Sequence, residues 1–424
     1  MDALPFSLLP DSASVADDGH LQIGGVRVGD LAAEFGTPLF VYDENHLRNR
    51  CREAVGALGA GNVIYATKAF LCRAMARLVH AEGLRLDVAT GGELHVAMAA
   101  GVPADRLVMH GNNKSTSELR RALDVGVGRL VVDSHNELDR IESLVAAGAP
   151  RPSVLLRINP GIEVHTHEHV RTGNLDSKFG FPLPTGQAEE AVARAEASDS
   201  MDLVGLHLHI GSQVFSVDNF LSGLGAVAPF VRALGLPELI VGGGLGVAYV
   251  AGEEAPTIAS WGSAIVDGCR ESGIEASVSV EPGRAIAAGA AITVYTVGTV
   301  KFIPGVRTYV AVDGGMSDNP RPVLYGSGYE TFLPRAVGAR REMPIRLVGK
   351  HCESGDLLVR EGIVPGDLAV GDLIATPVTG AYGHSMGSNY NKVGRPPVVF
   401  VADGVARLVV RRENDDDLLA TDVG

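Results

Sequence analysis

Eight short apolar runs between residues 63 and 280 end in side chains that could do chemistry. The groups at these ends are Lys68, Asp87, His110, Asp133, Arg157, His207 with His209, a glycine run at 242–246, and Glu281. Packing alone does not require functional groups at nearly every end. Because the C-terminal ends of parallel barrel strands meet at one face, we expect these groups to share a site.

Lys68 closes the apolar run at 63–67, where the pattern predicts that a strand gives way to a helix from Ala69. A buried ammonium group is costly unless it is paired, deprotonated or covalently used. This lysine is therefore either a surface group whose stem lies along apolar neighbours, or a chemical group. The other strand ends favour the chemical interpretation.

The run Gly242-Gly-Gly-Leu-Gly246 follows the seventh predicted strand. It does not fit the dinucleotide pattern Gly-x-Gly-x-x-Gly, because Val247 stands where the last glycine is required. Glycines at this place suit backbone N–H groups aimed at a phosphate, and Gly211 with Ser212 could form a second donor pair. A tight turn without a ligand is the alternative for the glycine run.

His207 and His209 share one face of a strand, so we expect one of them to point inward over a ligand. Either could instead be a satisfied core group. Glu281 could form an internal ion pair with Arg284, or it could lie beside a pyridine nitrogen and keep that nitrogen protonated. A Schiff-base lysine, a phosphate cradle, a stacking imidazole and this carboxylate together predict pyridoxal 5'-phosphate as the cofactor and no metal.

The elements that must position these groups follow a regular rhythm, in which β-branched runs alternate with helical Ala/Leu/Glu/Arg-rich segments. The predicted strands are 63–67, 84–89, 106–110, 129–133, 154–158, 204–210, 238–241 and 277–280. Eight strands with intervening helices predict an α/β fold of the (β/α)8 TIM-like barrel type.

A second pattern follows residue 290, where strands are joined by Gly/Pro-rich turns with little helix. The predicted strands are 292–302, 307–313, 344–350, 372–378, 397–401 and 405–411. A hairpin at 21–28 and a strand at 39–42 are too short to form a domain, so we expect them to join this sheet. The predicted division is N-terminal strands at 1–42, the barrel at 43–290 and an all-β domain at 291–424, with a charged, solvated tail.

Composition narrows the possible partners. The net charge is −14, without a Lys/Arg-rich run, which argues against nucleic acid or an anionic membrane as a partner. Four scattered cysteines without a Cys-x-x-Cys pair indicate a reduced, cytoplasmic protein, and no apolar stretch reaches the roughly 18 residues that a membrane span needs. The N-terminus lacks the pattern of a signal peptide.

Several motifs resemble those of the pyridoxal-phosphate decarboxylases that have an alanine-racemase-type barrel. The motifs include Tyr65-Ala-Thr-Lys68, His207-Leu-His-Ile-Gly-Ser212, Glu281-Pro-Gly-Arg284, His351-Cys-Glu-Ser-Gly-Asp356, Gly380-Ala-Tyr-Gly383, Arg321-Pro-Val-Leu-Tyr325, Thr172-Gly-x-x-x-Ser-Lys-Phe-Gly180 and Ser388-Asn-Tyr-Asn391. The resemblance covers essentially the whole chain from about Gly24. It implies a barrel of fold type III with a C-terminal β domain.

The resemblance also implies roles for individual residues. Lys68 would form the Schiff base, His209 would stack on the ring, and Glu281 would contact the pyridine nitrogen. The other implied cofactor-binding residues are Ser212, Gly243, Gly244, Pro282, Gly283, Arg284 and Tyr382. The implied substrate-binding residues are Arg284, Arg321, Tyr325, Glu353 and Tyr382.

Cys352 resembles the proton donor that a second subunit supplies, which implies a homodimer with shared active sites. Arg321 with Glu353 favours a two-headed zwitterion, so the expected reaction is decarboxylation of meso-2,6-diaminopimelate to L-lysine. D-ornithine, D-lysine, arginine or a specialised-pathway amino acid are alternative substrates. The chain departs from the commonest family pattern at Thr67, Phe70 and His384, and we expect His384 to titrate close to neutrality.

Two other classes of function also fit part of the pattern. A metal-dependent barrel hydrolase is suggested by His165-x-His167-x-His169 and by His207-x-His209, although such enzymes usually carry a His-x-His pair on the first strand. A non-enzymatic pyridoxal-phosphate carrier could use the same barrel. Cys352, Glu353 and Tyr382 in the added β domain argue against a carrier.

Overall fold

The computed structural model describes residues 3–161, 175–209 and 211–424, which divide into two compact units. Unit 1 comprises 1–49, 248–254 and 286–424, and unit 2 comprises 50–247 and 255–285. The chain thus leaves unit 2 after the seventh barrel strand, contributes 248–254 to unit 1, and returns. Each unit is described by itself below.

Unit 2 contains the eight parallel strands that the sequence predicts. They are β5 (Ile64–Ala66), β6 (Arg85–Val88), β7 (Leu107–Met109), β8 (Arg129–Val132), β9 (Ser153–Asn159), β11 (Asp202–Leu208), β12 (Glu238–Ile240) and β13 (Ser277–Ser279). A short strand, β10 (Phe181–Pro182), pairs with β9. Ile64 N donates to Val280 O at 2.9 Å and Val280 N to Asn62 O at 3.0 Å, so the first and last strands join and the sheet closes.

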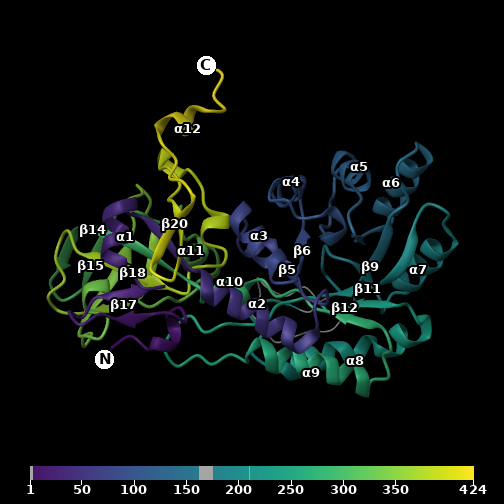
Figure 1. Cartoon of the computed structure of the whole chain (residues 1–424), viewed down its shortest axis with the longest axis horizontal. Helices are drawn as coiled ribbons and strands as arrows, with labels where there is room; N and C mark the ends of the chain where they lie inside the picture. The colour runs from purple at the N-terminus through teal and green to yellow at the C-terminus, as the bar shows by residue number, and fades with distance from the viewer. Residues whose placement is uncertain (1–2, 162–174, 210) are drawn as a thin grey trace. The chain divides into compact units, whose positions relative to one another are not determined.

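Helices lie outside these strands (Figure 1). They are α3 (Arg73–Ala81), α4 (Gly91–Ala99), α5 (Thr116–Val125), α6 (His135–Ala146), α7 (Gln187–Ala197), α8 (Val217–Leu234) and α9 (Ile258–Glu271), while α2 (Glu44–Leu58) and α10 (Arg284–Ala287) each cross a unit boundary. Within the described residues no helix combines the length and apolar character that a membrane crossing needs.

Three of these helices begin within a few residues of the preceding strand, at a capping residue that the sequence supplies. The caps of α4, α5 and α6 are Thr90, Ser115 and Ser134, and each side chain accepts a hydrogen bond from the N–H of a glutamate three residues on. At α5 the glutamate side chain also bonds back to the cap, which completes a capping box. Strand, loop and helix start are therefore fixed locally, and so are the residues at the strand ends.

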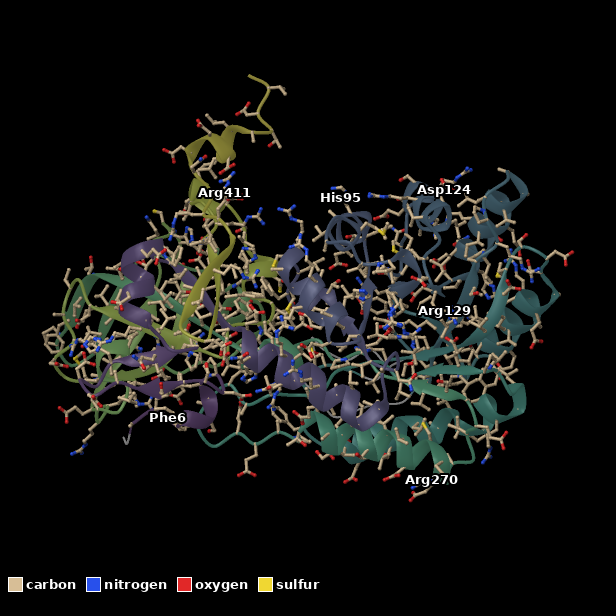
Figure 2. All side chains as sticks on the ribbon, in the orientation of Figure 1. Phe6, His95, Asp124, Arg129, Arg270 and Arg411 are labelled. Atoms are coloured by element: carbon tan, nitrogen blue, oxygen red, sulfur yellow. The ribbon has the colours of Figure 1, made fainter. Side chains whose placement is uncertain are left out.

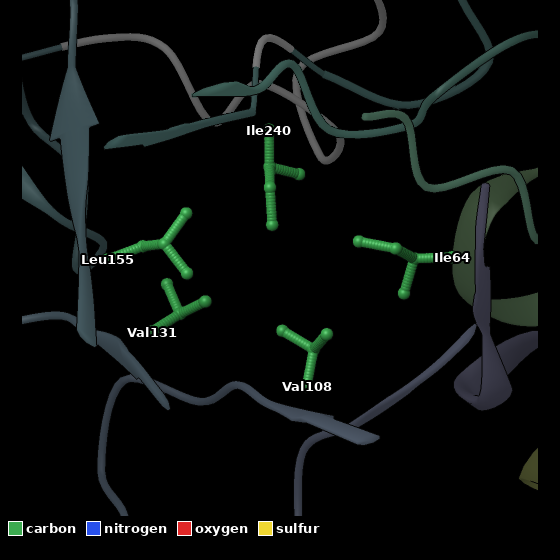
Figure 3. Close-up of a cluster of buried hydrophobic side chains, with 5 residues drawn as sticks. All are labelled: Ile64, Val108, Val131, Leu155 and Ile240. Atoms are coloured by element: carbon green, nitrogen blue, oxygen red, sulfur yellow. The ribbon is translucent and has the colours of Figure 1, made fainter. Parts of the chain in front are cut away.

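The barrel interior is filled in layers because alternate residues of a strand face the same side. In the middle, five fully buried side chains converge on one point (Figure 3): Ile64, Val108, Val131, Leu155 and Ile240. Towards the N-terminal ends lies a polar layer, in which Arg129 (labelled in Figure 2) pairs with Glu238 and Arg85 donates to Ser279 Oγ at 3.0 Å. Two residues further towards the C-terminal end of each strand, the side chains again face the interior. They form the upper layer, which contains the candidate site.

Unit 1 is built on an eight-stranded sheet with the order β17-β16-β15-β14-β4-β19-β20, in which β18 also pairs with β14. The strands are β4 (Leu39–Asp43), β14 (Ala291–Ile303), β15 (Arg307–Val312), β16 (Met343–Val348), β17 (Leu357–Val364), β18 (Leu373–Pro377), β19 (Val398–Ala402) and β20 (Val405–Val410). β17 has no counterpart among the predicted strands, because Arg360 and Glu361 interrupt its apolar pattern and are exposed.

The N-terminal segment divides between two sheets. The predicted hairpin is confirmed as β2 (Leu21–Ile23) and β3 (Val26–Arg27). With β1 (Ser14–Val15) it forms a separate three-stranded sheet, so the prediction that it joins the large sheet was wrong. β4 instead lies between β14 and β19 in the large sheet. Unit 1 also contains helices α1 (Val28–Phe35), α11 (Arg321–Tyr325) and α12 (Asp415–Leu419), the last of which forms part of the charged tail.

Candidate active site

Lys68 lies just beyond β5 in a short 3-10 turn, η2 (Thr67–Ala69). Its side chain is exposed, whereas both neighbours are buried, and Thr67 Oγ1 donates to Asp87 O at 2.7 Å. The prediction of a helix from Ala69 was wrong: Phe70 is extended, and α3 begins at Arg73. This extended segment separates strand and helix, so Lys68 is held firmly at its backbone while its amine remains accessible.

Glu281 lies at the mouth of the barrel between two imidazoles. Its Oε1 is 2.9 Å from His110 Nε2, and its Oε2 is 2.9 Å from His207 Nε2. All three side chains are buried. His110 follows β7, His207 lies within β11 and Glu281 follows β13. These strands are not neighbours in the sheet, so the three side chains meet across the barrel interior.

The charge state of this group follows from its contacts. Burial raises the pKa of Glu281, but His110 and His207 outweigh burial and hold that pKa well below its usual range. Burial lowers the pKa of His207 to about 4. Glu281 is therefore ionised and His207 neutral at neutral pH.

A second carboxylate of the upper layer behaves in the opposite way. Asp87 is buried, and burial raises its pKa to about 7, with Glu281 adding to the shift while His110 and Lys68 oppose it. Two carboxylates whose pKa values are driven apart are typical of a site that handles protons. The influence of Lys68 on Asp87 also places the Lys68 amine near the upper layer.

His209 is partly exposed and lies one residue after β11. Burial, followed by the charges of Lys68 and Arg157, lowers the pKa of His209 well below its usual value. A neutral imidazole close to Lys68 suits stacking on an aromatic ring. Its proposed contact with the cofactor ring remains a prediction.

The glycine run after β12 is required by close backbone packing. A Cβ at Gly242, Gly243 or Gly244 would lie 2.4, 2.1 or 2.0 Å from a neighbouring backbone oxygen, and Gly242 and Gly244 have positive φ. The loop after β11 pairs with this run, because Val214 N donates to Gly244 O at 2.9 Å. Only glycine fits here, and the loop exposes backbone rather than side chains.

The predicted phosphate residues of unit 2 lie around this run. Gly243 is next to the backbone of Glu281, and Gly244 is next to Gly211. Arg284 donates from Nη2 to Ser212 Oγ at 2.9 Å. Pro282 and Gly283 continue from Glu281 into α10, and a Cβ at Gly283 would lie 2.8 Å from that of Ala66.

Unit 1 contains the predicted substrate residues Arg321 and Tyr325, which are the first and last residues of α11. Arg321 is 5% exposed, and its guanidinium lies over the ring of Tyr249 and donates to Tyr329 Oη. Tyr325 is exposed. The guanidinium is therefore oriented by aromatic neighbours that the sequence analysis did not identify.

Cys352 and Glu353 lie in an exposed loop that is anchored on both sides. Asp356 accepts hydrogen bonds from Met316 N at 2.7 Å and His351 N at 2.8 Å, and Cys352 N donates to Asn391 Oδ1 at 3.2 Å. Hydrogen bonds from Gly355 N and the Ser354 hydroxyl lower the pKa of Glu353. The loop therefore presents a thiol and an ionised carboxylate to the solvent.

Tyr382, also in unit 1, is partly buried and has a φ of +61°, a conformation that side chains other than glycine seldom adopt. Nearby His384 packs edge-on against Phe40 with ring centres 5.7 Å apart. Burial lowers the pKa of His384 to about 4, so the prediction that it titrates close to neutrality was wrong. His384 acts here as a neutral aromatic ring.

The residues of the metal-hydrolase alternative are only partly described. His165, His167 and His169 lie outside the described residues, as do Thr172 and Ile210 of the family motifs. Within the described residues one group has the spacing of metal ligands, and it consists of His110, His207 and Glu281 rather than the pair His207 and His209. His207 Nε2 is hydrogen-bonded to Glu281 Oε2 at 2.9 Å, and His110 Nε2 lies 2.9 Å from Oε1, so these side chains already contact one another directly.

The site residues fit pyridoxal phosphate in three respects. The glycine loop presents backbone where a Cβ would collide, which suits a phosphate cradle. Glu281 remains an anion although it is buried, which suits a cationic ring nitrogen. Lys68 is accessible and near Asp87 and His209, which suits attachment to an aldehyde carbon.

Comparison with known proteins gives a consistent result. A family model described as "Pyridoxal-dependent decarboxylase, pyridoxal binding domain" matches residues 44–288. Diaminopimelate decarboxylase of Mycobacterium tuberculosis is 46% identical and that of Bacillus subtilis 43%, with 98% and 96% of this chain and 97% and 95% of those proteins covered. The crystal structure of the M. jannaschii diaminopimelate decarboxylase with L-lysine superposes with a TM-score of 0.90 at 31% identity, covering 98% of both chains.

The barrel, the accessible lysine and the phosphate loop define an enzyme of the pyridoxal-phosphate barrel class. Within that class the chain belongs to the pyridoxal-dependent decarboxylase family, since the family model covers more than half of it and relatives match nearly all of it. The cofactor, fold and decarboxylase class predicted from the sequence are confirmed.

Proposed function

We propose that the chain decarboxylates meso-2,6-diaminopimelate to L-lysine and carbon dioxide, the last step of lysine biosynthesis. The near-full-length similarity to diaminopimelate decarboxylases carries this proposal. The chemistry of the side chains supports it, because Arg321 and Glu353 could bind the carboxylate and ammonium of a second amino-acid head.

Pyridoxal phosphate, when bound, supplies an electron sink for the pair left behind when the bond between the α-carbon and the carboxylate breaks. We assign ten residues to cofactor binding. They are Lys68, His209, Ser212, Gly243, Gly244, Glu281, Pro282, Gly283, Arg284 and Tyr382. Lys68 would hold the aldehyde carbon, Glu281 would hold the proton on the ring nitrogen, and the glycines, Ser212 and Tyr382 would bind the phosphate.

The chain's own residues would then complete the reaction. Arg321, with Arg284, Tyr325 and Tyr382, would bind carboxylate groups of the substrate, and Glu353 would bind the distal ammonium. A missing partner at either head would leave a charge uncompensated, which favours a substrate with both heads. Cys352 would give a proton to the α-carbon as carbon dioxide leaves, so that one proton replaces one carboxylate.

We also propose a homodimer in which each subunit completes the other's site. The exposure of Cys352 and Glu353 in a single chain supports this arrangement, as does the exposed face of α11 formed by Val323, Leu324 and Tyr325. Four scattered cysteines without a Cys-x-x-Cys pair suit a reducing, cytoplasmic location, and the negative net charge suits small-molecule rather than nucleic-acid partners.

Complementation tests the shared site. Lys68→Ala and Cys352→Ala chains are each expected to be inactive as homodimers. A one-to-one mixture, unfolded and refolded together, should recover roughly a quarter of wild-type activity, since half of the dimers are mixed and each has one intact site. No recovery in dimers that are shown to be mixed would refute sharing.

Substrate identity is tested by carbon dioxide release from meso-diaminopimelate, D-ornithine, D-lysine and arginine under identical conditions. We expect diaminopimelate to have a kcat/KM at least 100-fold above the others. Glu353→Gln should lower this preference, and Glu361→Gln, a change at an exposed glutamate on β17, should leave it unchanged. A wild-type preference for D-ornithine, D-lysine or arginine would replace the proposed substrate with that amino acid.

A further inference from the structure

The arrangement around Glu281 goes beyond a carboxylate that meets a ring nitrogen. Each of its two oxygens is 2.9 Å from the Nε2 atom of a different histidine, His110 on one side and His207 on the other. The two imidazole rings lie edge-to-face, with centres 4.9 Å apart. The contact of His207 with Oε2 is a hydrogen bond, whereas His110 lies against Oε1 without hydrogen-bond geometry. The carboxylate is thus enclosed by side chains from two other strands.

The protonation of His207 follows from its surroundings. Its Nδ1 is buried and has no hydrogen-bond partner among the described residues, whereas its Nε2 faces Glu281. A neutral imidazole has one N–H, and an unpaired buried N–H is costly. His207 therefore carries its proton on Nε2 and donates it to Glu281 Oε2.

It matters that the donor is a neutral imidazole, because the acceptor, Glu281, is a buried anion. A lysine or arginine at either position would form an ion pair and cancel the carboxylate charge. A neutral N–H donor instead stabilises the anion by hydrogen bonding and leaves its negative charge for another cation. Other ionisable groups that act on this site are Asp87, Lys68, Arg85, Arg157 and His209.

We propose that His207 is a positioning residue that acts through Glu281: with His110 against the other oxygen, it fixes the orientation of the carboxylate and stabilises its charge without cancelling it. This inference rests on the proposed role of Glu281 at the cofactor ring. Its consequence is that His207 determines how strongly the cofactor binds and how readily its ring nitrogen keeps a proton.

Variants of His207 separate the donor from the bulk of the side chain. Glutamine can place its amide N–H near the position of Nε2, asparagine is one methylene shorter and falls short, and phenylalanine fills the space without a donor. We expect His207→Phe and His207→Asn to weaken cofactor binding to the apoprotein by 10-fold or more, and His207→Gln to restore most of it.

The readouts do not depend on turnover. Cofactor affinity is measured by titrating apoprotein with pyridoxal phosphate, and the pH titration of the bound cofactor's absorbance should shift to lower pH in the variants that lack the donor. His95→Gln, an exposed histidine on α4 (Figure 2), is the matched control and should change neither quantity.

The outcomes are distinct from those of the substrate assay. Wild-type affinity and an unshifted absorbance titration in correctly folded His207→Phe and His207→Asn proteins would overturn the positioning role, whichever amino acid is decarboxylated. If phenylalanine prevents folding, the comparison of asparagine with glutamine decides, because both are polar and differ only in reach. Loss of diaminopimelate activity with intact cofactor binding would instead count against the proposed substrate.

Discussion

The guanidinium carbon of Arg321 lies 4.2 Å from the centre of the Tyr249 ring, and a second ring, that of Tyr329, lies 5.5 Å away. The two tyrosines pack edge-to-face with centres 5.3 Å apart. Arg321 Nη1 also donates to Tyr329 Oη. A long, flexible side chain is thereby held in one orientation before any substrate carboxylate arrives.

Removing the Tyr249 ring should weaken this hold. A cation–π contact of this kind is worth about 1–2 kcal/mol when desolvated, so Tyr249→Leu is expected to raise the KM for diaminopimelate by about 5- to 30-fold. Tyr249→Phe should keep most of the affinity because the ring remains. Tyr309→Leu is the matched control, since Tyr309 faces Arg307 at 5.9 Å elsewhere in unit 1; an equal rise in KM there would contradict the specific role of Tyr249.

Replacing Lys68 tests the attachment point of the cofactor. Lys68→Ala should abolish turnover and the visible absorbance of bound cofactor, because no other side chain is proposed to bond its aldehyde carbon. Lys301→Ala, a change at an exposed lysine on β14, should leave both unchanged. Retention of the wild-type absorbance and rate in Lys68→Ala would remove Lys68 from the mechanism.

A methyl group in the glycine loop should have a large effect. A Cβ at Gly244 would lie 2.0 Å from Gly211 O, and its φ of +101° is unfavourable for alanine, so Gly244→Ala is expected to lower cofactor affinity by at least 100-fold. A methyl group added at Gly225 of α8 would meet no neighbouring atom within 4 Å, so Gly225→Ala should stabilise the protein by about 0.5–1 kcal/mol. Thermal unfolding and cofactor titration of both proteins separate these effects; unchanged affinity in Gly244→Ala would rule out the cradle.

Stability should depend on the protonation of Asp318 in unit 1. Asp318 is 1% exposed, and burial, with Asp313 and Asp356 nearby, raises its pKa to about 7. The folded state therefore binds this proton more tightly than the unfolded state. The resulting stabilisation is full below about pH 4 and is lost as the pH rises through 7.

Asp318→Asn mimics the protonated carboxyl and keeps an oxygen for Gly315 N, which donates to Asp318 Oδ2 at 2.9 Å. The variant should lack this pH dependence and should exceed the wild type at pH 8 by on the order of 2–4 kcal/mol. Urea denaturation at pH 5 and pH 8 measures the difference. Asp199→Asn, at an exposed position, is the control, and parallel pH profiles for the wild type and Asp318→Asn would refute the assignment.

The barrel could be predicted because the sequence signals for its strands and helices lie close to those elements in the chain. β-branched runs, glycine turns and caps such as Ser115 lie within a few residues of the elements that they define. The residues of the upper layer could also be predicted, since Glu281 and His110 each stand at a strand end. The start of the helix after Lys68 could not be predicted. Phe70 is buried in an extended conformation, and the helical composition of the segment does not reveal this.

The partners of the site residues were much harder to predict. The sequence alone did not connect Glu281 to His110, 171 positions earlier by numbering, or assign which oxygen each histidine would meet. Tyr249 lies 72 positions before Arg321 and belongs to the short segment 248–254 that joins unit 1. Such contacts depend on closure of the barrel and on the return of the chain, neither of which leaves a periodic pattern.

The apolar middle layer of the barrel has a practical consequence for redesign. Ile64, Val108, Val131, Leu155 and Ile240 separate the Arg129–Glu238 pair from the ionisable groups at the mouth. Contacts at the lower end can therefore be redesigned for heat tolerance without altering the side chains at the mouth, provided that the net charge of the lower layer is kept, because Glu281 acts electrostatically on Arg85. The scaffold thus divides durability and chemistry between opposite ends of one set of strands.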